Sequence, residues 1–273
     1  MYYLSININK SIIFFTIVFI VIIIIICKIL LNKQIDYFFN KTNNIISICI
    51  PLIPRDIDKI PNLIKSINKQ TLLPDEIIIS LSGYNENNDL QLENKFKKIS
   101  KIPLKLIIHN ETKYAGENRN IASSYSNGNI IVFMDADDIF TYDAIEKTDY
   151  IFKKYNPLSF IHNYEIFYNL NDVDNLLNKK QTNLKQRIVF GDELYNIAKN
   201  SNTLFLPHFN NNDKIHHGHL TINKEILKNI KQNNNLKRGQ DSDYVRNILN
   251  TFGAKKNTMI YTNDILSYYY IRT

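Results

Sequence analysis

The chain contains few cysteines and few glycines for its length. Its 273 residues include two cysteines, Cys27 and Cys49, and seven glycines. Both cysteines lie in apolar runs without a second thiol or a metal-ligand spacing nearby, so we expect them to be buried small side chains. A disulfide framework is therefore excluded, which suits a reducing compartment and also permits a lumenal one.

The chain also lacks an arginine-rich stripe, although its formal net charge is +7. Its lysines are scattered among asparagines and isoleucines. Proteins that bind nucleic acids typically gather basic residues on one face, so we expect no nucleic-acid partner. The length is enough for one large domain or two small ones, with ample material for a hydrophobic core.

One long apolar run stands near the start of the chain. Residues 12–27 carry no charge, and Lys28 can extend its side chain toward lipid headgroups, so the run reaches about the 20 residues that cross a bilayer. A cleaved signal peptide would have a shorter apolar core, and a buried helix of this length would show a polar face. The sequence therefore predicts a tail at residues 1–11 and one transmembrane anchor at residues 12–31.

The lysines around this predicted anchor are unevenly distributed. Lys10 precedes it, whereas Lys33 and Lys41 lie among those that follow it. Basic residues favour the cytosolic side of a membrane, so we expect a single-pass membrane protein whose main domain faces the cytosol, with the lumenal orientation as the alternative. A polar stem at residues 32–44 would connect the anchor to this domain, at residues 45–273.

Three carboxylates follow a short apolar segment in the middle of the chain. The segment 130–134 has the composition of a strand buried on both faces, and Asp135, Asp137 and Asp138 come directly after it. Unpaired ionised groups cannot stay in an interior, so we expect them at the strand's carboxyl end, where open α/β sheets bind ligands. Extended backbone would point Asp135 and Asp137 to one side, an arrangement that suits Mg²⁺ or Mn²⁺. The alternative is a solvated acidic turn.

Strand and helix patterns alternate before these acids and continue after them. Right-handed crossovers make such an order a parallel sheet with helices on both faces, with the acids after its fourth strand. The predicted elements are strands at 45–51, 76–81, 104–109 and 159–168, and helices at 58–68, 89–100, 116–126, 142–155, 191–200 and from 238 to about 251.

Five short segments of the chain form a recognisable pattern: Ser47–Pro51, Ser66–Thr71, Pro74–Ile79, Gly116–Ala122 and Phe133–Asp138. Together they resemble glycosyltransferase family 2, whose domains have the GT-A fold. Their order and spacing carry the resemblance, which implies an α/β fold of the GT-A type. Such a fold has a mostly parallel central sheet with flanking helices, here preceded by the predicted transmembrane helix.

The resemblance also implies a reaction and its site. It implies transfer of a sugar from a nucleotide-sugar donor to an acceptor hydroxyl, with Mn²⁺ or Mg²⁺ on Asp135 and Asp137. The implied donor-binding residues are Pro51, Ser82, Arg119, Asn120, Asp135 and Asp138. The family usually has two aspartates and a glycine where this chain has Leu81, Ser82 and Gly83, so Ser82 offers the nucleotide base only a neutral hydrogen bond.

The predicted last helix opens with Gln240 and Asp241, where the family has an acidic residue and an aspartate that serves as catalytic base. The resemblance therefore implies that Asp241 is the catalytic base. A second interpretation is structural, because an acid in a helix's first turn is stabilised by backbone N–H groups and the helix dipole.

Several histidines crowd the segment before this helix, among them His216, His217 and His219. Adjacent side chains of an extended chain point to opposite faces, so at most two of these three could share one ion. His217 and His219 are our candidates for completing the metal site, and polar packing in a loop is the alternative.

We therefore expect a membrane-anchored, metal-dependent glycosyltransferase that inverts the anomeric centre, with a glycan, protein or lipid acceptor. Two other classes stay open. Haloacid-dehalogenase-like phosphatases also carry Asp-x-Asp after an apolar strand, but on their first strand and usually with Thr or Val where this chain has Ile139. A membrane-anchored sugar-binding or scaffold protein that has lost catalysis is the second alternative.

Overall fold

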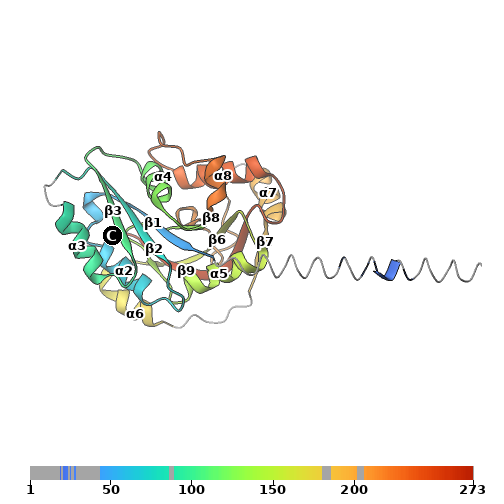
Figure 1. Cartoon of the computed structure of the whole chain (residues 1–273), viewed down its shortest axis with the longest axis horizontal. Helices are drawn as coiled ribbons and strands as arrows, with labels where there is room; N and C mark the ends of the chain where they lie inside the picture. The colour runs from blue at the N-terminus through green and yellow to red at the C-terminus, as the bar shows by residue number, and fades with distance from the viewer. Residues whose placement is uncertain are drawn as a thin grey trace, which may run out of the picture. The chain divides into compact units, whose positions relative to one another are not determined.

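In the computed structural model, the apolar runs that precede the three acids pair as neighbouring parallel strands. β1 pairs with β2 and β4, and β2 pairs with β3, all in parallel. The carboxyl ends of these strands therefore meet at one edge of the sheet (Figure 1). The strands are β1 (Ile46–Leu52), β2 (Glu76–Ser82), β3 (Leu104–His109), β4 (Ile130–Phe133), β5 (Ile139–Phe140), β6 (Ser159–Phe167), β7 (Ile188–Phe190), β8 (Thr221–Asn223) and β9 (Ile260–Tyr270).

The second half of the sheet is mixed, which corrects the predicted mostly parallel sheet. The strand order is β3-β2-β1-β4-β8-β6-β9-β5, with β7 paired to β9. β8 runs antiparallel to both β4 and β6, and β9 is parallel to β6 but antiparallel to β5 and β7. A strand's apolar pattern does not encode the direction of its neighbour, because the connections decide that direction.

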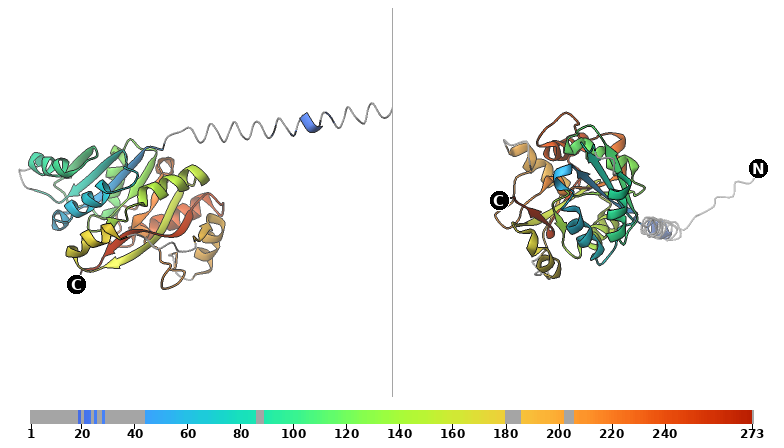
Figure 2. Two further views of the ribbon diagram at one scale, coloured as in Figure 1. Left: turned by 90° about the horizontal axis from the view of Figure 1, so that it is seen from below. Right: turned by 90° about the vertical axis from the view of Figure 1, so that its left-hand side faces the viewer.

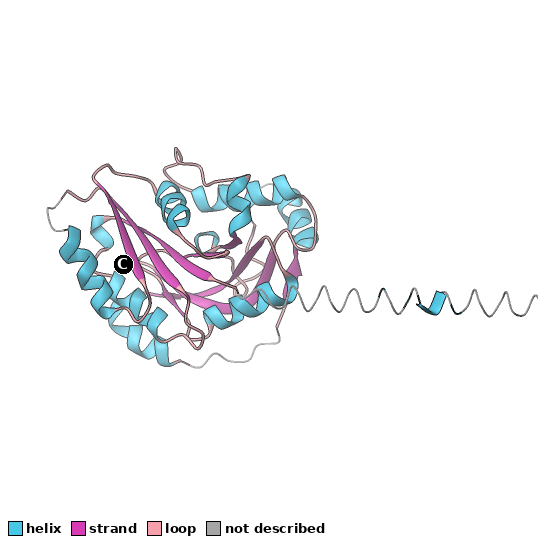
Figure 3. Cartoon of the chain, in the orientation of Figure 1, coloured by secondary structure: helices cyan, strands magenta, loops and turns pink. Residues whose placement is uncertain are grey.

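Helices cover both faces of the sheet (Figures 1 and 3). Side chains of α2, α3 and α5 join one hydrophobic cluster with the sheet, and side chains of α4, α7 and α8 join another. Figure 2 shows these two layers from other directions. The helices are α2 (Ile60–Asn68), α3 (Asp89–Ile99), α4 (Ala115–Tyr125), α5 (Ala144–Tyr155), α6 (Val173–Asn178), α7 (Gly191–Asn200) and α8 (Gln240–Phe252), with 3₁₀ turns η1 (Pro54–Asp56), η2 (Leu170–Asp172), η3 (His217–His219) and η4 (Lys224–Lys228).

β4 is buried on both faces, as predicted. Ile130 and Val132 belong to the cluster under α2, and Ile131 and Phe133 belong to the cluster under α4. None of the four is more than 2% exposed. Because both faces are apolar, the acids that follow have to leave the sheet where β4 ends.

The structure describes residues 44–272 except 86–88, 180–185 and 202–205, together with six residues between positions 19 and 28. In this described part, no helix has the length and apolar character needed to cross a bilayer, so the predicted single-pass localisation is wrong by this finding. The apolar run has the composition of a span of about 20 residues, and six of its residues belong to the described part. Most of the predicted anchor at 12–31 and all of the tail at 1–11 lie outside the described residues.

Candidate active site

A pocket of about 570 Å³ lies at the carboxyl edge of the parallel strands. The end of β1, the start of α4, the segment after β4 and the start of α8 contribute to its walls. Ten charged side chains line it, six of them basic (Arg55, Lys113, Arg119, Lys237, Arg238, Arg272) and four acidic (Asp56, Asp135, Asp137, Asp241). The excess of positive charge favours a ligand that carries several negative charges.

The three acids after β4 form a turn instead of continuing the strand. The backbone N–H of Asp138 donates to the carbonyl oxygen of Asp135 over 3.2 Å. Asp135 and Asp137 line the pocket, whereas Asp138 is fully buried. The prediction that Asp135 and Asp137 lie on one side agrees with this pocket, but a turn and not extended backbone places them there.

Asp135 is held by Arg119, a residue of α4. The Nη2 of Arg119 donates to Oδ1 of Asp135, and the Arg119 side chain is 4% exposed. Gly218 makes room for this pair, because a Cβ there would lie 3.0 Å from Oδ2 of Asp135 and 3.2 Å from Nη2 of Arg119. An ion pair between α4 and the segment after β4 therefore fixes the carboxylate of Asp135 at the edge of the pocket.

Asp137 is held by a different arginine, Arg272, which follows β9. Nη2 of Arg272 lies 2.7 Å from Oδ2 of Asp137 and also 2.7 Å from Oδ1 of Asp56. Burial raises the pKa of the Asp137 carboxyl, and Arg272 only partly offsets this effect. A nearby cation therefore favours the charged form of Asp137.

Asp138 and His219 form a pair in the interior. Oδ2 of Asp138 lies 2.6 Å from Nε2 of His219, and both side chains are 0% exposed. Nδ1 of His219 lies 2.7 Å from Oγ of Ser267, and the N–H of Tyr270 donates to Oδ1 of Asp138 over 2.7 Å. Burial raises the pKa of the Asp138 carboxyl and lowers the pKa of His219 to about 4. Burial therefore favours the neutral form of both groups.

This protonation state gives a stability prediction. Asp138→Asn should change the free energy of unfolding by about 1 kcal/mol or less, because an amide accepts from Tyr270 and donates to His219 as a neutral carboxyl does. Asp138→Ala should lower it by about 3 kcal/mol, because both partners lose a buried hydrogen bond. Urea denaturation of the two variants measures the difference. Equal losses for Asn and Ala would mean that Asp138 is ionised in the folded protein.

Two histidines come together behind the pocket, but they are not the two that we predicted. One ligand atom from each of Asp135, Asp138, His216 and His219 lies within 4.8 Å of the others. Nδ1 of His216 is buried without a hydrogen-bond partner in the described part of the chain. Burial lowers the pKa of His216 well below its usual value, so its ring is neutral and suited to bind a metal ion.

His217 lies outside this cluster. The prediction assumed extended backbone, but this segment forms the turn η3, and in such a turn residues three apart lie on the same side. The spacing of His216 and His219 was therefore the signal that identifies this pair.

Asp241 lies in the first turn of α8 and lines the same pocket as Asp135 and Asp137. Gly239 ends the preceding loop with a left-handed φ of 71°, and Oδ1 of Asp241 accepts from the N–H of Ser242 over 2.8 Å. The structural and catalytic interpretations of Asp241 are thus both compatible with its position.

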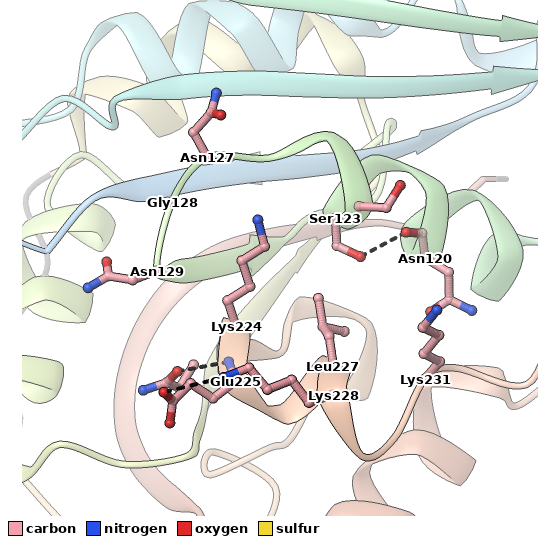
Figure 4. Close-up of a pocket in the computed structure, with 12 residues that line it drawn as sticks. Asn120, Ser123, Asn127, Gly128, Asn129, Lys224, Glu225, Leu227, Lys228 and Lys231 are labelled. Atoms are coloured by element: carbon pink, nitrogen blue, oxygen red, sulfur yellow. Dashed lines mark hydrogen bonds and ion pairs between the residues drawn. The ribbon is translucent and has the colours of Figure 1, made fainter.

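The predicted donor-binding residues divide between the pocket and its surroundings. Pro51 and Arg119 line the pocket, whereas Ser82 is buried and accepts from Nδ2 of Asn118 over 2.8 Å. Asn118 lines the pocket and Ser82 does not. Ser82 therefore helps to position a residue of the pocket wall instead of facing the pocket itself. Asn120 lines a separate pocket at the other end of α4, together with lysines of η4 (Figure 4).

Sequence reasoning missed six charged residues in the pocket wall: Arg55, Asp56, Lys113, Lys237, Arg238 and Arg272. Asp56 carried a usable signal, because it follows β1 at the carboxyl edge where ligands bind. No local pattern marks Arg272, which contacts an acid 135 residues earlier in the chain.

Comparisons with known proteins agree with this fold. S. aureus TarS 1–349 in complex with UDP is 16% identical, with a TM-score of 0.56 over 83% of this chain and 60% of that one. A mannosyltransferase from Pyrobaculum calidifontis, PcManGT in complex with GDP-Man and Mn²⁺, is 12% identical, with a TM-score of 0.51 over 85% of this chain and 63% of that one. The chain thus spans about three fifths of these structures. No curated protein sequence matches it.

The similarity to these structures shows a GT-A-like α/β fold with a mixed sheet. The sequence profile described as Glycosyl transferase family 2 matches residues 47–230, which is most of the described part of the chain and includes Asp135, Asp137 and the histidines of η3. The chain therefore belongs to glycosyl transferase family 2.

Proposed function

We propose that residues 45–273 form a domain that transfers a sugar from a nucleotide-sugar donor to an acceptor hydroxyl. The observation that carries this proposal is the pocket that brings Asp135, Asp137 and Asp241 together among six basic side chains. The similar structures of TarS were solved with UDP and with UDP-GlcNAc, and PcManGT was solved with GDP-Man and Mn²⁺. Each of these nucleotide ligands is an anion of the kind that the basic pocket favours.

The residues also fit a divalent cation. Asp135 and Asp137 offer carboxylate oxygens to the pocket, and Asp135, Asp138, His216 and His219 offer four ligand atoms behind it. Asp135 belongs to both sets. Mn²⁺ or Mg²⁺ bound there would stabilise the negative charge that develops on the departing nucleoside diphosphate.

Side chains of the pocket would also bind the donor and accept the proton of the acceptor. Asp135, fixed by Arg119, would accept hydrogen bonds from the donor's ribose, and Arg119 would stabilise the diphosphate. Asp241, across the pocket, would take the proton from the acceptor hydroxyl as general base. A single displacement of this kind inverts the anomeric centre. The acceptor is a glycan, a protein or a lipid.

A donor screen tests this function. The purified chain is incubated with UDP-, GDP- and TDP-sugars, with Mn²⁺, with Mg²⁺ or with EDTA, and release of the nucleoside diphosphate is measured. We expect release from one class of donor and its loss in EDTA. Donor binding without any release would support the sugar-binding alternative. Release of phosphate from simple phosphate esters without nucleotide-sugar turnover would support the phosphatase alternative.

A further inference from the structure

We propose that Arg272 is a diphosphate-binding residue that serves as the counter-ion of Asp137 until a divalent cation and the donor bind together. The inference rests on the proposed function and deepens it, since it concerns how the same pocket is loaded. It also assigns a role to a residue that lies outside the part of the chain matched by the family profile.

The first observation is the bridge that Arg272 forms across the pocket. One nitrogen, Nη2, contacts Oδ2 of Asp137 and Oδ1 of Asp56, each over 2.7 Å. The side chains of Asp137 and Asp56 are 19% and 8% exposed, and the side chain of Arg272 is 36% exposed. A guanidinium therefore contacts a carboxylate oxygen of Asp137, a group that the proposed cation would also need.

The second observation is that the two acids differ in their need for Arg272. Asp56 also pairs with Arg55 and Lys59, each over 3.2 Å. Burial alone would raise the pKa of Asp56, but Arg55, Lys59 and Arg272 together lower it below its usual value. Asp137 pairs with Arg272, and in the described part of the chain no other lysine or arginine lies within ion-pair distance of it. Without Arg272, Asp56 would thus keep two cationic partners, whereas Asp137 would keep none among the described lysines and arginines.

The third observation is that the backbone before Arg272 is anchored. The N–H of Tyr270 donates to Oδ1 of Asp138, within the acidic turn itself, and the N–H of Ile271 donates to the carbonyl oxygen of Phe167 over 3.0 Å. Only the side chain of Arg272 is therefore free to change its partner. Contact with Asp56 would keep the guanidinium at the pocket while it leaves Asp137.

The guanidinium of Arg272 also has further N–H groups that could donate hydrogen bonds to a phosphate. The hydrogen bonds found in the described residues use Nη2, and the guanidinium carries five N–H donors in a planar fork that matches phosphate oxygens. A divalent ion on Asp137 would repel the guanidinium, and a diphosphate would offer it a new anionic partner. The divalent cation and the diphosphate should therefore bind cooperatively. The cation replaces the guanidinium beside Asp137, and the diphosphate gives the displaced guanidinium a new anionic partner.

Calorimetric titrations of the full chain test this inference with Arg272→Gln and a matched control, Arg55→Gln. Arg55 pairs with Asp56 but not with Asp137, so both variants remove one positive charge from the same pocket. With Mn²⁺ alone, Arg272→Gln should bind on the order of tenfold more tightly than wild type, and Arg55→Gln should change by clearly less. With UDP or GDP at saturating Mn²⁺, Arg272→Gln should bind on the order of tenfold more weakly.

Unchanged or weaker Mn²⁺ affinity in Arg272→Gln, or equal effects of the two substitutions, would overturn the inference. Arg272→Lys provides a second variant should the glutamine variant not fold. It keeps the counter-ion, so its affinity for Mn²⁺ alone should match wild type, while the loss of the planar fork should weaken UDP or GDP binding. If wild type shows no Mn²⁺-dependent binding of UDP or GDP, the metal dependence in the proposed function fails as well. If wild type shows it and neither Arg272 variant changes, only the role of Arg272 fails.

Discussion

Asp241→Asn should lower turnover of the donor by roughly two orders of magnitude or more and leave the melting temperature nearly unchanged. An amide cannot take up the acceptor's proton at neutral pH, and the loss of a general base typically costs about 10²- to 10⁴-fold. The same amide keeps the structural contact, because its oxygen can accept from the N–H of Ser242 as Oδ1 of Asp241 does. Initial rates with the donor found in the screen, together with thermal melting, measure both effects.

Asp243→Asn is the matched control on the same helix. Asp243 is held by Arg246 and Asn247 and does not line the pocket. Its substitution should leave turnover per folded molecule within about threefold of wild type, although the loss of a partly buried ion pair can lower stability slightly. Near wild-type turnover in Asp241→Asn would place the base elsewhere, with His217 as the next candidate. A large fall in melting temperature with turnover preserved would leave Asp241 with the structural role alone.

Asp137→Asn should abolish the Mn²⁺ dependence of UDP or GDP binding. Asparagine keeps the size of the side chain and removes the charge that faces the pocket. We expect affinity in Mn²⁺ to fall by about a hundredfold or more, since loss of outer partners of metal ligands already costs roughly 10- to 100-fold. The fold should persist, because a partly exposed ion pair such as Asp137–Arg272 contributes about 1 kcal/mol or less. Titrations with and without EDTA measure the effect.

Two further variants sharpen this test. Asp58→Asn removes the same charge from a side chain that is 73% exposed and does not line the pocket, so it should leave binding unchanged. His216→Ala separates the two sets of candidate ligands. If the ion binds to Asp135 and Asp137, the His216 variant keeps its metal dependence. If metal dependence is lost in His216→Ala and retained in Asp137→Asn, the ion binds in the cluster with Asp138 and His219 instead.

Local patterns in the sequence were enough to predict the strands and helices around the pocket. The runs at 45–51, 76–81 and 104–109 became β1, β2 and β3, and the helix predicted at 191–200 became α7 with the same bounds. These segments are readable because an uninterrupted apolar run, or apolar residues at helical spacing, reflects how much of each segment is buried. Burial on both faces was likewise evident from the composition of β4.

Strand direction in the second half of the sheet was not readable in this way. β8 has three residues, and its composition does not distinguish a parallel from an antiparallel neighbour. Its position between β4 and β6 depends on how the chain returns through η3, which is a property of the whole fold. The prediction of a mostly parallel sheet extended a rule that holds for alternating strands and helices to a region where that alternation stops.

The candidate site, like the sheet, could be predicted from the sequence only in part. Sequence reasoning found Asp135 and Asp137 because a doubly buried strand excludes charge and delivers it to the sheet's edge. It did not find that Asp138 turns into the interior to meet His219, 81 residues later, or that Arg272 reaches Asp137 from 135 residues away. From the sequence alone, a carboxylate next to a buried strand can be expected to pair with a cation, bind a proton or contact water. Which distant group meets that need depends on the packing of the sheet, and here the tertiary structure selected a histidine for Asp138 and an arginine for Asp137.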